Sequence, residues 1–221
     1  MREWEEHAQR EERRYGDGEA RLEDAGDDDA RQRQLTRLGN AAYGAALSYL
    51  MLGRRERAAE WFGRAVDRYR ESLETAPPGS WGRYIGSLKS RVLADDWGGA
   101  EDEARATLAA GAERADSPIG KYAAALAHLV LGQDHDARRL ADEIRTREDF
   151  PRPVGDALAM LAAGTDSIGY IDAVEEVLES FEQREEYLED VPVADTVLVL
   201  QALASRRDLV AELSSPLLPA P

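Results

Sequence analysis

The sequence predicts an all-α protein in which antiparallel helical hairpins stack as an array or close into a compact α-α bundle. Small and aromatic residues recur at helical spacings on both sides of Gly53, and a weaker version of this pattern surrounds Gly132. No segment shows the sustained alternation of apolar and polar residues that is typical of a half-buried strand. The β-like run at residues 197–200 lies within a helical window. Such patterns are typical of two helices that approach closely at small side chains and turn at a glycine.

The N-terminal residues 1–28 are expected to form a charged leader. A frayed helix should begin it and end at Gly16-Asp17-Gly18, since glycine lowers helix stability, and an acidic linker follows at residues 24–29. A sparse stripe of larger side chains, through which this helix could dock onto the rest of the chain, consists of Trp4, His7 and Tyr15.

The helical domain is predicted to span residues 29–213. Its first helix should begin at an N-cap, Asp28 or Asp29, and end at Gly53. The next helix should stop before the helix-breaking Pro77-Pro78-Gly79. The expected helices that follow Gly53 cover residues 54–75, 81–94 and 98–110.

Ser117 and Pro118 mark the start of a second hairpin, because a serine N-cap followed by proline at the first helical position favours a helix start. Gly132 should form the corner of this hairpin. The remaining predicted segments are helices at residues 118–131, 134–147, 151–163, 165–188 and 193–205, a final turn or two at 207–213, and an extended tail at 214–221.

The stretch from Asn40 to Asp67 resembles a tetratricopeptide repeat. The small, aromatic and turn positions of that family fall on Ala46, Tyr49, Gly53, Ala58, Phe62 and Ala65. Arg70 stands where the family has its closing proline, and the unit around Gly132 has His128 at the aromatic position. The resemblance implies a helical-repeat fold whose concave surface binds another protein.

In such repeats, residues on the exposed side of the first helix of each unit line the binding groove. The resemblance places there Asn40, Tyr43, Leu47, Ile85, Lys89, Tyr122 and Leu126. Most of these residues are apolar, and the Lys and Asn set with which related arrays hold a C-terminal carboxylate is missing, apart from Lys89 and Asn40. A charged tail is therefore not the expected ligand. The stripe should contact a partner helix or peptide, a second copy of the chain, or the chain's own terminal helices.

The charge of the chain disfavours several classes of partner. Asp and Glu outnumber Lys and Arg by 44 to 28, so the net charge is -16, and such a body repels phosphate backbones and anionic membrane surfaces. Every basic residue among these except Lys89 and Lys121 is arginine. Abundant carboxylates with almost no lysine indicate a salt-accumulating organism, and a GC-rich genome is the alternative explanation.

The composition also bears on location and cofactors. The chain has no cysteine, which excludes disulfides and thiolate metal sites. No run approaches the ~18 apolar residues of a membrane span. The first six residues lack the apolar core of a signal peptide. We therefore expect a cytoplasmic protein without a cofactor.

Few side chains are suited to catalysis. His7, His128 and His135 lack the i, i+4 spacing of a helical zinc site, and His128 occupies a position where a hydrogen-bonded packing histidine is expected. Neighbouring carboxylates such as Asp95 and Asp96 lack calcium-loop spacing and are expected on a solvated face. The sequence thus favours a non-enzymatic protein-binding scaffold or adaptor, with an acidic metal-dependent hydrolase as an alternative.

Another alternative is an immunity protein that neutralises a toxin by binding it. The alanine- and leucine-rich residues 195–205, followed by Ser215-Pro216-Leu217-Leu218-Pro219, resemble the C-terminal end of helical bacterial immunity proteins. This resemblance implies a toxin as the partner.

If Ala46 lies at a close helix crossing, the substitution Ala46→Leu should overpack the first hairpin and lower the free energy of unfolding by roughly 1–3 kcal/mol. Urea denaturation of the purified variant measures this loss. An unchanged denaturation midpoint would contradict the predicted hairpin.

Overall fold

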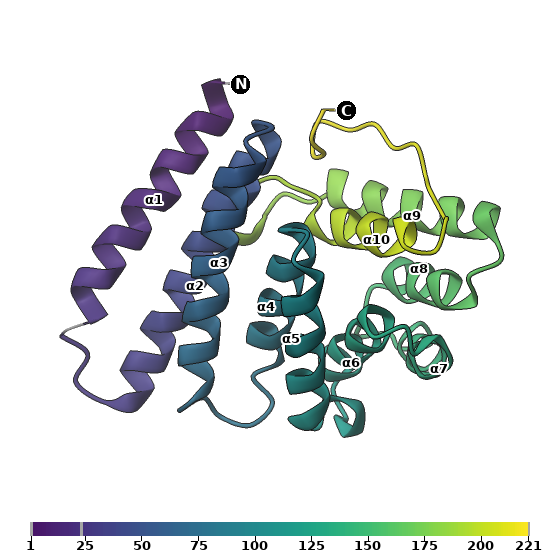
Figure 1. Cartoon of the computed structure of the whole chain (residues 1–221), viewed down its shortest axis with the longest axis horizontal. Helices are drawn as coiled ribbons and strands as arrows, with labels where there is room; N and C mark the ends of the chain where they lie inside the picture. Colours follow the sequence, from purple (N-terminus) through teal and green to yellow (C-terminus); the bar gives the residue numbers. More distant parts are fainter. Residues whose placement is uncertain (1, 23, 221) are drawn as a thin grey trace. The chain divides into compact units, whose positions relative to one another are not determined.

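The computed structural model describes residues 2–22 and 24–220, and all regular secondary structure in these residues is helical (Figure 1). This confirms the predicted all-α class. Each α-helix packs against the helix before or after it. The elements are α1 (Arg2–Leu22), α2 (Asp28–Met51), α3 (Arg55–Leu73), α4 (Trp81–Leu93), α5 (Trp97–Ala109), η1 (Ala112–Arg114), α6 (Pro118–Val130), α7 (Asp134–Ile144), α8 (Arg152–Ala163), α9 (Ser167–Glu182), η2 (Leu188–Asp190) and α10 (Asp195–Ser205).

The contacts divide the described residues into two compact units. The first unit contains α1 to α4 together with residues 185–193 and 216–220, and the second contains residues 97–184 and 194–215. The predicted leader therefore contributes α1 to the first unit, to which α2, α3 and α4 also belong.

The predicted first hairpin forms from α2 and α3. Gly53 connects the two helices with a φ of +69°, in the left-handed region that glycine adopts without steric cost. Ala46 and Ala65 are completely buried, and Ala58 is 2% exposed. The small side chains predicted for the hairpin therefore lie in the core, where they allow close packing.

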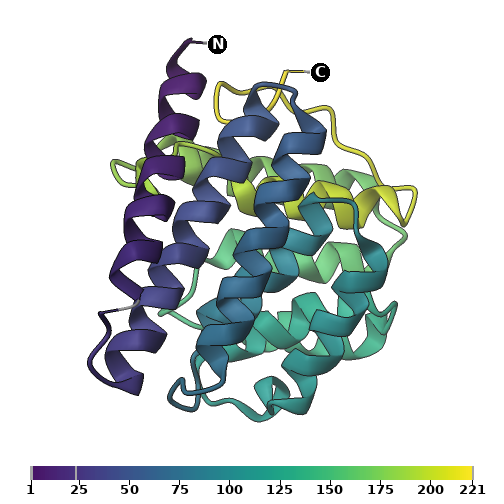
Figure 2. The ribbon, with the colours of Figure 1, turned by 60° about the vertical axis from the view of Figure 1, so that its left-hand side comes forward.

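The middle of helix α2 is buried on every side. All residues from Ala41 to Tyr49 are buried. α1 and α3 pack along α2, and α4 and η2 also contact it; Figure 2 shows α1, α2 and α3 side by side. An enclosed helix has no solvent-facing side, and small residues let several elements approach it at once. This explains the glycine- and alanine-rich sequence of α2.

Helix α1 is longer and more closely packed than predicted. The expectation that Gly16-Asp17-Gly18 ends it is wrong, because α1 continues through these residues to Leu22. A Cβ atom added at Gly18 would lie 2.7 Å from Cδ2 of Leu38 on α2. Gly18 thus serves close helix packing, whose gain offsets the low helix propensity of glycine. The buried residues of α1 follow a 3-4-3 spacing along one seam and are Ala8, Glu11, Tyr15 and Gly18.

Three carboxylates, spaced seven residues apart on α1, pair with arginines at the start of α3 or along it. Glu5 accepts from Arg54 at 2.5 Å and Glu19 accepts from Arg68 at 2.6 Å. Between them, Glu12 accepts from Arg57 at 3.2 Å. Such partly exposed pairs each contribute little free energy. Because they repeat at the heptad spacing, they specify the register of α1 along the hairpin.

The ring of Tyr69 on α3 lies between glycines of the two neighbouring helices. A Cβ atom added at Gly39 of α2 would lie 2.7 Å from Cδ1 of this ring, and one added at Gly86 of α4 would lie 2.6 Å from its Cε2. The hydroxyl of Tyr69 donates to Oδ1 of Asn40 at 2.9 Å. The two glycines therefore let α2, α3 and α4 pack around one aromatic side chain.

The second unit contains the hairpin predicted around Gly132. The N-cap Ser117 accepts a hydrogen bond from the backbone N–H of Gly120 at 3.2 Å, and Gly132 turns the chain between α6 and α7 with a φ of +69°. Ala125, Ala137, Ala141 and Ile144 are completely buried. The glycine corner and the small core positions of this hairpin are thus as predicted.

Three predicted helix boundaries need correction. The N-cap of α2 is Asp27, whose side chain accepts from the backbone N–H of Ala30 at 2.7 Å, and not Asp28 or Asp29. α9 ends at Glu182 and not near residue 188. Carboxylates at residues 185 and 186 would lie at the negative end of a longer helix, which disfavours its extension. Residues 207–213 form a turn and irregular chain after α10, not a further helix.

Gly39→Ala should destabilise the first unit, because the ring of Tyr69 is confined between Gly39 and Gly86 and has no free side toward which to move. We expect a loss of about 1–3 kcal/mol in the free energy of unfolding, measured by urea denaturation. Gly63→Ala is the matched control. Its added Cβ meets no atom within 4 Å, so helix propensity should raise stability by about 0.5–1 kcal/mol. Equal effects at the two sites would contradict the assigned role of Tyr69.

Candidate functional site

Most residues nominated for the groove are buried in the structure. The buried ones are Tyr43, Leu47 and Lys89 in the first unit and Tyr122 and Leu126 in the second. Asn40 and Ile85, both in the first unit, are half-buried. Tyr43 packs its ring 5.6 Å from that of Phe62, and Tyr122 packs 5.5 Å from Phe150. The apolar side chains nominated here therefore serve mainly as core.

Asn40 is the nominated residue that contacts a segment from a distant part of the sequence. Its Nδ2 donates to Oε1 of Glu189 at 3.2 Å, while its Oδ1 accepts from Tyr69. Glu189 belongs to η2, within residues 185–193, which we call the return segment because it rejoins the first unit after α9. Val191 of this segment is 2% exposed. The return segment thus occupies the face of α2 beside Asn40.

Two arginines of α1 bind the same segment. The guanidinium of Arg10 donates to the main-chain carbonyl of Glu189 at 2.6 Å and to that of Asp190 at 3.3 Å. Arg14 forms an ion pair with the Glu189 carboxylate, whose side chain is 13% exposed. The sequence does not single out either arginine, because a frayed leader would hold neither side chain in a fixed position. Their spacing of one helical turn was a signal that they could share a ligand.

A buried carboxylate holds the two guanidinium groups in place. Glu11 is completely buried and accepts from Arg10 Nε at 2.7 Å and from Arg14 Nη1 at 3.0 Å. Burial raises the pKa of Glu11, and the hydrogen bonds and charges of both arginines oppose that rise. A Cβ added at Gly44 of α2 would lie 3.1 Å from Cγ of Glu11. The glycine therefore leaves room for the carboxylate between α1 and α2.

The bound part of the return segment has a strained backbone. Glu189 and Asp190 both have a φ of +54°, in the left-handed region that is costly for residues with a side chain. Leu188, next to them, is 54% exposed. The charged and main-chain contacts to α1 hold this conformation in place, with little contribution from the side chain of Leu188.

Next to Arg14 the surface between α1 and α2 forms a small hollow of about 120 Å³, which we call the arginine hollow. Its charged and polar side chains are Arg14, Asp17, Arg21, Gln34 and Arg37, and its floor is Gly18, Leu38 and Ala41. In the part of the chain that the structure describes, Arg21 and Arg37 form no ion pair. Among the described residues, two guanidinium groups of the hollow therefore have no carboxylate partner.

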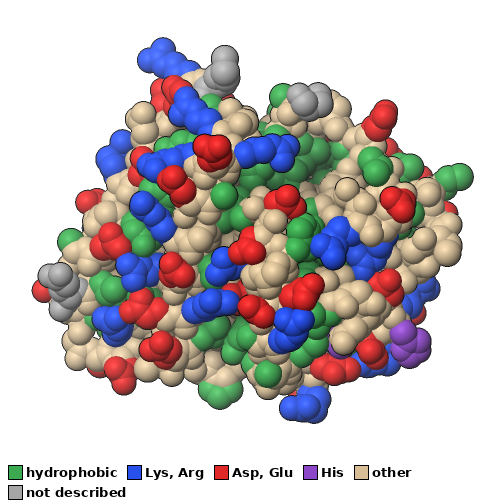
Figure 3. Space-filling model, in the orientation of Figure 1, with side chains coloured by type: hydrophobic (Ala, Val, Ile, Leu, Met, Phe, Trp, Pro, Cys, Tyr) green, Lys and Arg blue, Asp and Glu red, His purple; other side chains and the backbone are tan. Residues whose placement is uncertain are grey.

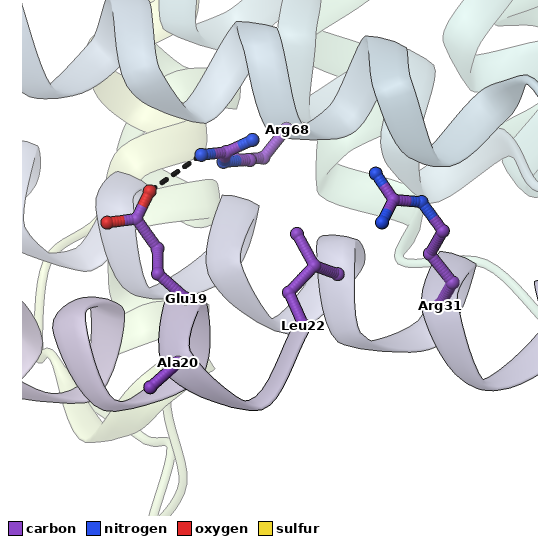
Figure 4. A pocket seen from close by; sticks show the side chains of 5 residues that line it. All are labelled: Glu19, Ala20, Leu22, Arg31 and Arg68. Carbon is purple, nitrogen blue, oxygen red and sulfur yellow. Dashed lines mark hydrogen bonds and ion pairs between the residues drawn. The ribbon is translucent and has the colours of Figure 1, made fainter. Parts of the chain in front are cut away.

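A second hollow, of about 550 Å³, lies where the C-terminal part of α1 meets α2 and α3 (Figure 4). Its arginines are already neutralised: Arg68 donates to Glu19, as the dashed line in Figure 4 marks, and Arg31 pairs with Glu71. On the face drawn in Figure 3, basic and acidic side chains likewise alternate over the helices. The arginine hollow differs because its charge is only partly compensated.

The histidines have the surroundings expected of structural residues. His128 is 5% exposed, and its Nδ1 lies 2.7 Å from Oε1 of Gln133, which confirms the predicted packing role. The imidazole of His135 is 95% exposed. His7 is half-buried, and burial followed by the charge of Arg10 lowers its pKa. Within residues 2–22 and 24–220, no three His, Asp or Glu side chains are placed to hold a metal ion together.

Comparisons with known proteins add no relative. The sequence matches no family model, and neither the curated proteins nor the solved structures give a match. Among the described helices, none combines the length and the apolar character of a membrane span. The all-helical architecture therefore rests on the packed helices of the structure itself.

Glu11→Gln should change how stability depends on pH. The folded-state pKa of Glu11 lies above its ordinary value of 4.5, so its contribution to stability is fully present below that value and is lost as pH rises through the folded pKa. Glutamine does not titrate. The free energy of unfolding of the variant should therefore improve relative to wild type as pH rises from about 4.5 toward neutrality.

Urea denaturation at a series of pH values measures this difference. Glu6→Gln, which removes an exposed carboxylate from the same helix, is the matched control. Parallel pH profiles for Glu11→Gln and wild type would contradict the assigned environment of Glu11.

Proposed function

We propose that this protein is a non-enzymatic scaffold of tetratricopeptide-like helical hairpins that binds another protein. The observation that carries the proposal is the binding of the return segment by Arg10, Arg14 and Asn40. These side chains contact two main-chain carbonyls and one carboxylate of that segment. The surface between α1 and α2 thus has the groups needed to hold an irregular stretch of polypeptide.

Contacts of this kind suit protein recognition. Donors to main-chain carbonyls hold a peptide whatever its side chains are, while a guanidinium paired with a carboxylate adds specificity for one side chain. The two helical hairpins, with left-handed glycines at their corners and buried alanines between their helices, support the repeat interpretation. We propose a cytoplasmic location and a protein partner, which includes a second copy of this chain.

A toxin-neutralising immunity protein is the second candidate. Exposed carboxylates of the second unit surround a hollow of about 200 Å³ and are Glu175, Glu179, Glu182 and Glu212. A toxin that acts on nucleic acid must present Lys and Arg to phosphates, and those groups would be complementary to such a surface. This observation favours a basic partner for the second unit.

The experiment is a pull-down with the full chain at the ionic strength of its source organism, followed by sedimentation of the purified protein. A partner captured in a fixed ratio, or a concentration-dependent dimer, supports the scaffold. A captured toxin, or a toxin gene beside that of this protein, supports the immunity function. A monomer that captures nothing and hydrolyses a substrate with an added divalent metal would overturn both in favour of the hydrolase.

A further inference from the structure

We propose that the groove between α1 and α2 binds an acidic peptide segment of the partner protein, and that the return segment, Glu185–Val193, is an internal competitor for this groove. This inference rests on the proposed scaffold function. It names the chemistry of the ligand and the residues that select it.

The return segment shows how such a ligand would be held. Arg10 donates to the carbonyls of two successive residues, Glu189 and Asp190, while Arg14 and Asn40 bind the Glu189 carboxylate. The buried Glu11 carboxylate accepts hydrogen bonds from both arginines, so these donors are already positioned before a peptide binds. A site organised in this way loses little conformational entropy when it binds.

The return segment does not use all of the basic groups in the groove. Arg14 contacts Glu189 and also lines the arginine hollow, so the two sites are continuous. The guanidinium groups of Arg21 and Arg37 line the far part of this hollow, where the structure, as far as it is described, gives them no ion pair. Asp17 is the carboxylate that lines the hollow with them. A ligand with several carboxylates could therefore engage more arginines than the return segment does.

The return segment fits the groove between α1 and α2 poorly, because its backbone is strained there. Glu189 and Asp190 are bound with a φ of +54°, whereas a separate peptide is free to bind in an unstrained conformation. The neighbouring Leu188 remains 54% exposed. The covalent link gives the return segment a high effective concentration, which compensates for its weak fit. A better-fitting acidic peptide can displace it.

Charge complementarity selects a peptide over a nucleic acid. The groove presents Arg10, Arg14, Arg21 and Arg37, but the whole chain has a net charge of -16 and repels an extended polyanion. A short acidic segment can place its few carboxylates on the arginines without extending over the acidic remainder of the surface. The arginine–carboxylate pairs would provide orientation as well as attraction.

The test is fluorescence anisotropy with the full-length protein and a labelled synthetic peptide in which a short run of glutamates is flanked by glycines, so that its carboxylates can reach more arginines than the return segment does. The control peptide replaces each glutamate by glutamine. We expect the acidic peptide to bind and the glutamine peptide to bind at least about tenfold more weakly. Binding of both peptides with equal affinity, or of neither, would overturn the inference.

Two sets of variants locate the site. Arg21→Ala combined with Arg37→Ala should weaken peptide binding about tenfold without shifting the denaturation midpoint, because both side chains are exposed. Arg13→Ala combined with Arg55→Ala removes two other exposed arginines and should leave binding unchanged. Glu189→Gln weakens the internal competitor and should tighten binding several-fold. An unchanged affinity in the Arg21 and Arg37 variant would show that the arginine hollow is not the site.

Two further measurements separate this inference from the scaffold proposal and from other anions. If wild type and the Arg21 and Arg37 variant capture the same partner equally well, the scaffold stands and the assigned groove is wrong. Displacement of the peptide by inorganic phosphate or a single-stranded oligonucleotide at equal concentration would overturn the choice of a protein ligand. The acidic peptide is supported as the ligand if neither anion displaces the bound peptide and the Arg21 and Arg37 variant no longer captures the partner.

Discussion

Close approach at small residues is the constraint on which the first unit depends. α2 is surrounded by α1, α3, α4 and the return segment, and it can be so enclosed only because its middle is rich in glycine and alanine. Gly39 admits the ring of Tyr69, and Gly44 admits Glu11. A single added methyl group at such a position would press against a neighbour that has little room to move. The small residues therefore decide which elements can meet at α2.

That close approach has an electrostatic consequence. Because α1 lies directly on α2, the Glu11 carboxylate is removed from water and becomes the shared acceptor of Arg10 and Arg14. Burial of a charge is costly, and the two guanidinium groups offset part of that cost. The same groups then face the return segment. Packing, the buried charge and the candidate binding groove are thus linked through one turn of α1.

The candidate groove also shows that net charge describes a protein only on average. The chain has 16 more negative than positive charges, yet the surface between α1 and α2 concentrates arginines around a small hollow. Elsewhere many arginines pair with carboxylates on neighbouring helices, as Arg68 does with Glu19. A local basic site within an acidic surface restricts the proposed ligand, because long polyanions are repelled while short acidic segments can approach.

The sequence alone determined the helical class, the two hairpins and the burial of their small residues, because glycine corners, caps and apolar periodicity act over a few neighbouring residues. Gly53, Gly132 and Ser117 could be assigned in this way. It did not reveal that α1 continues through Gly18, since the reason is a contact with Leu38 on another helix. Nor did it reveal the candidate groove, because Arg10 meets Glu189 across 179 residues of chain. These features arise from long-range packing: local patterns specify each helix, whereas the partners of a charged side chain depend on which helices can approach closely enough to meet.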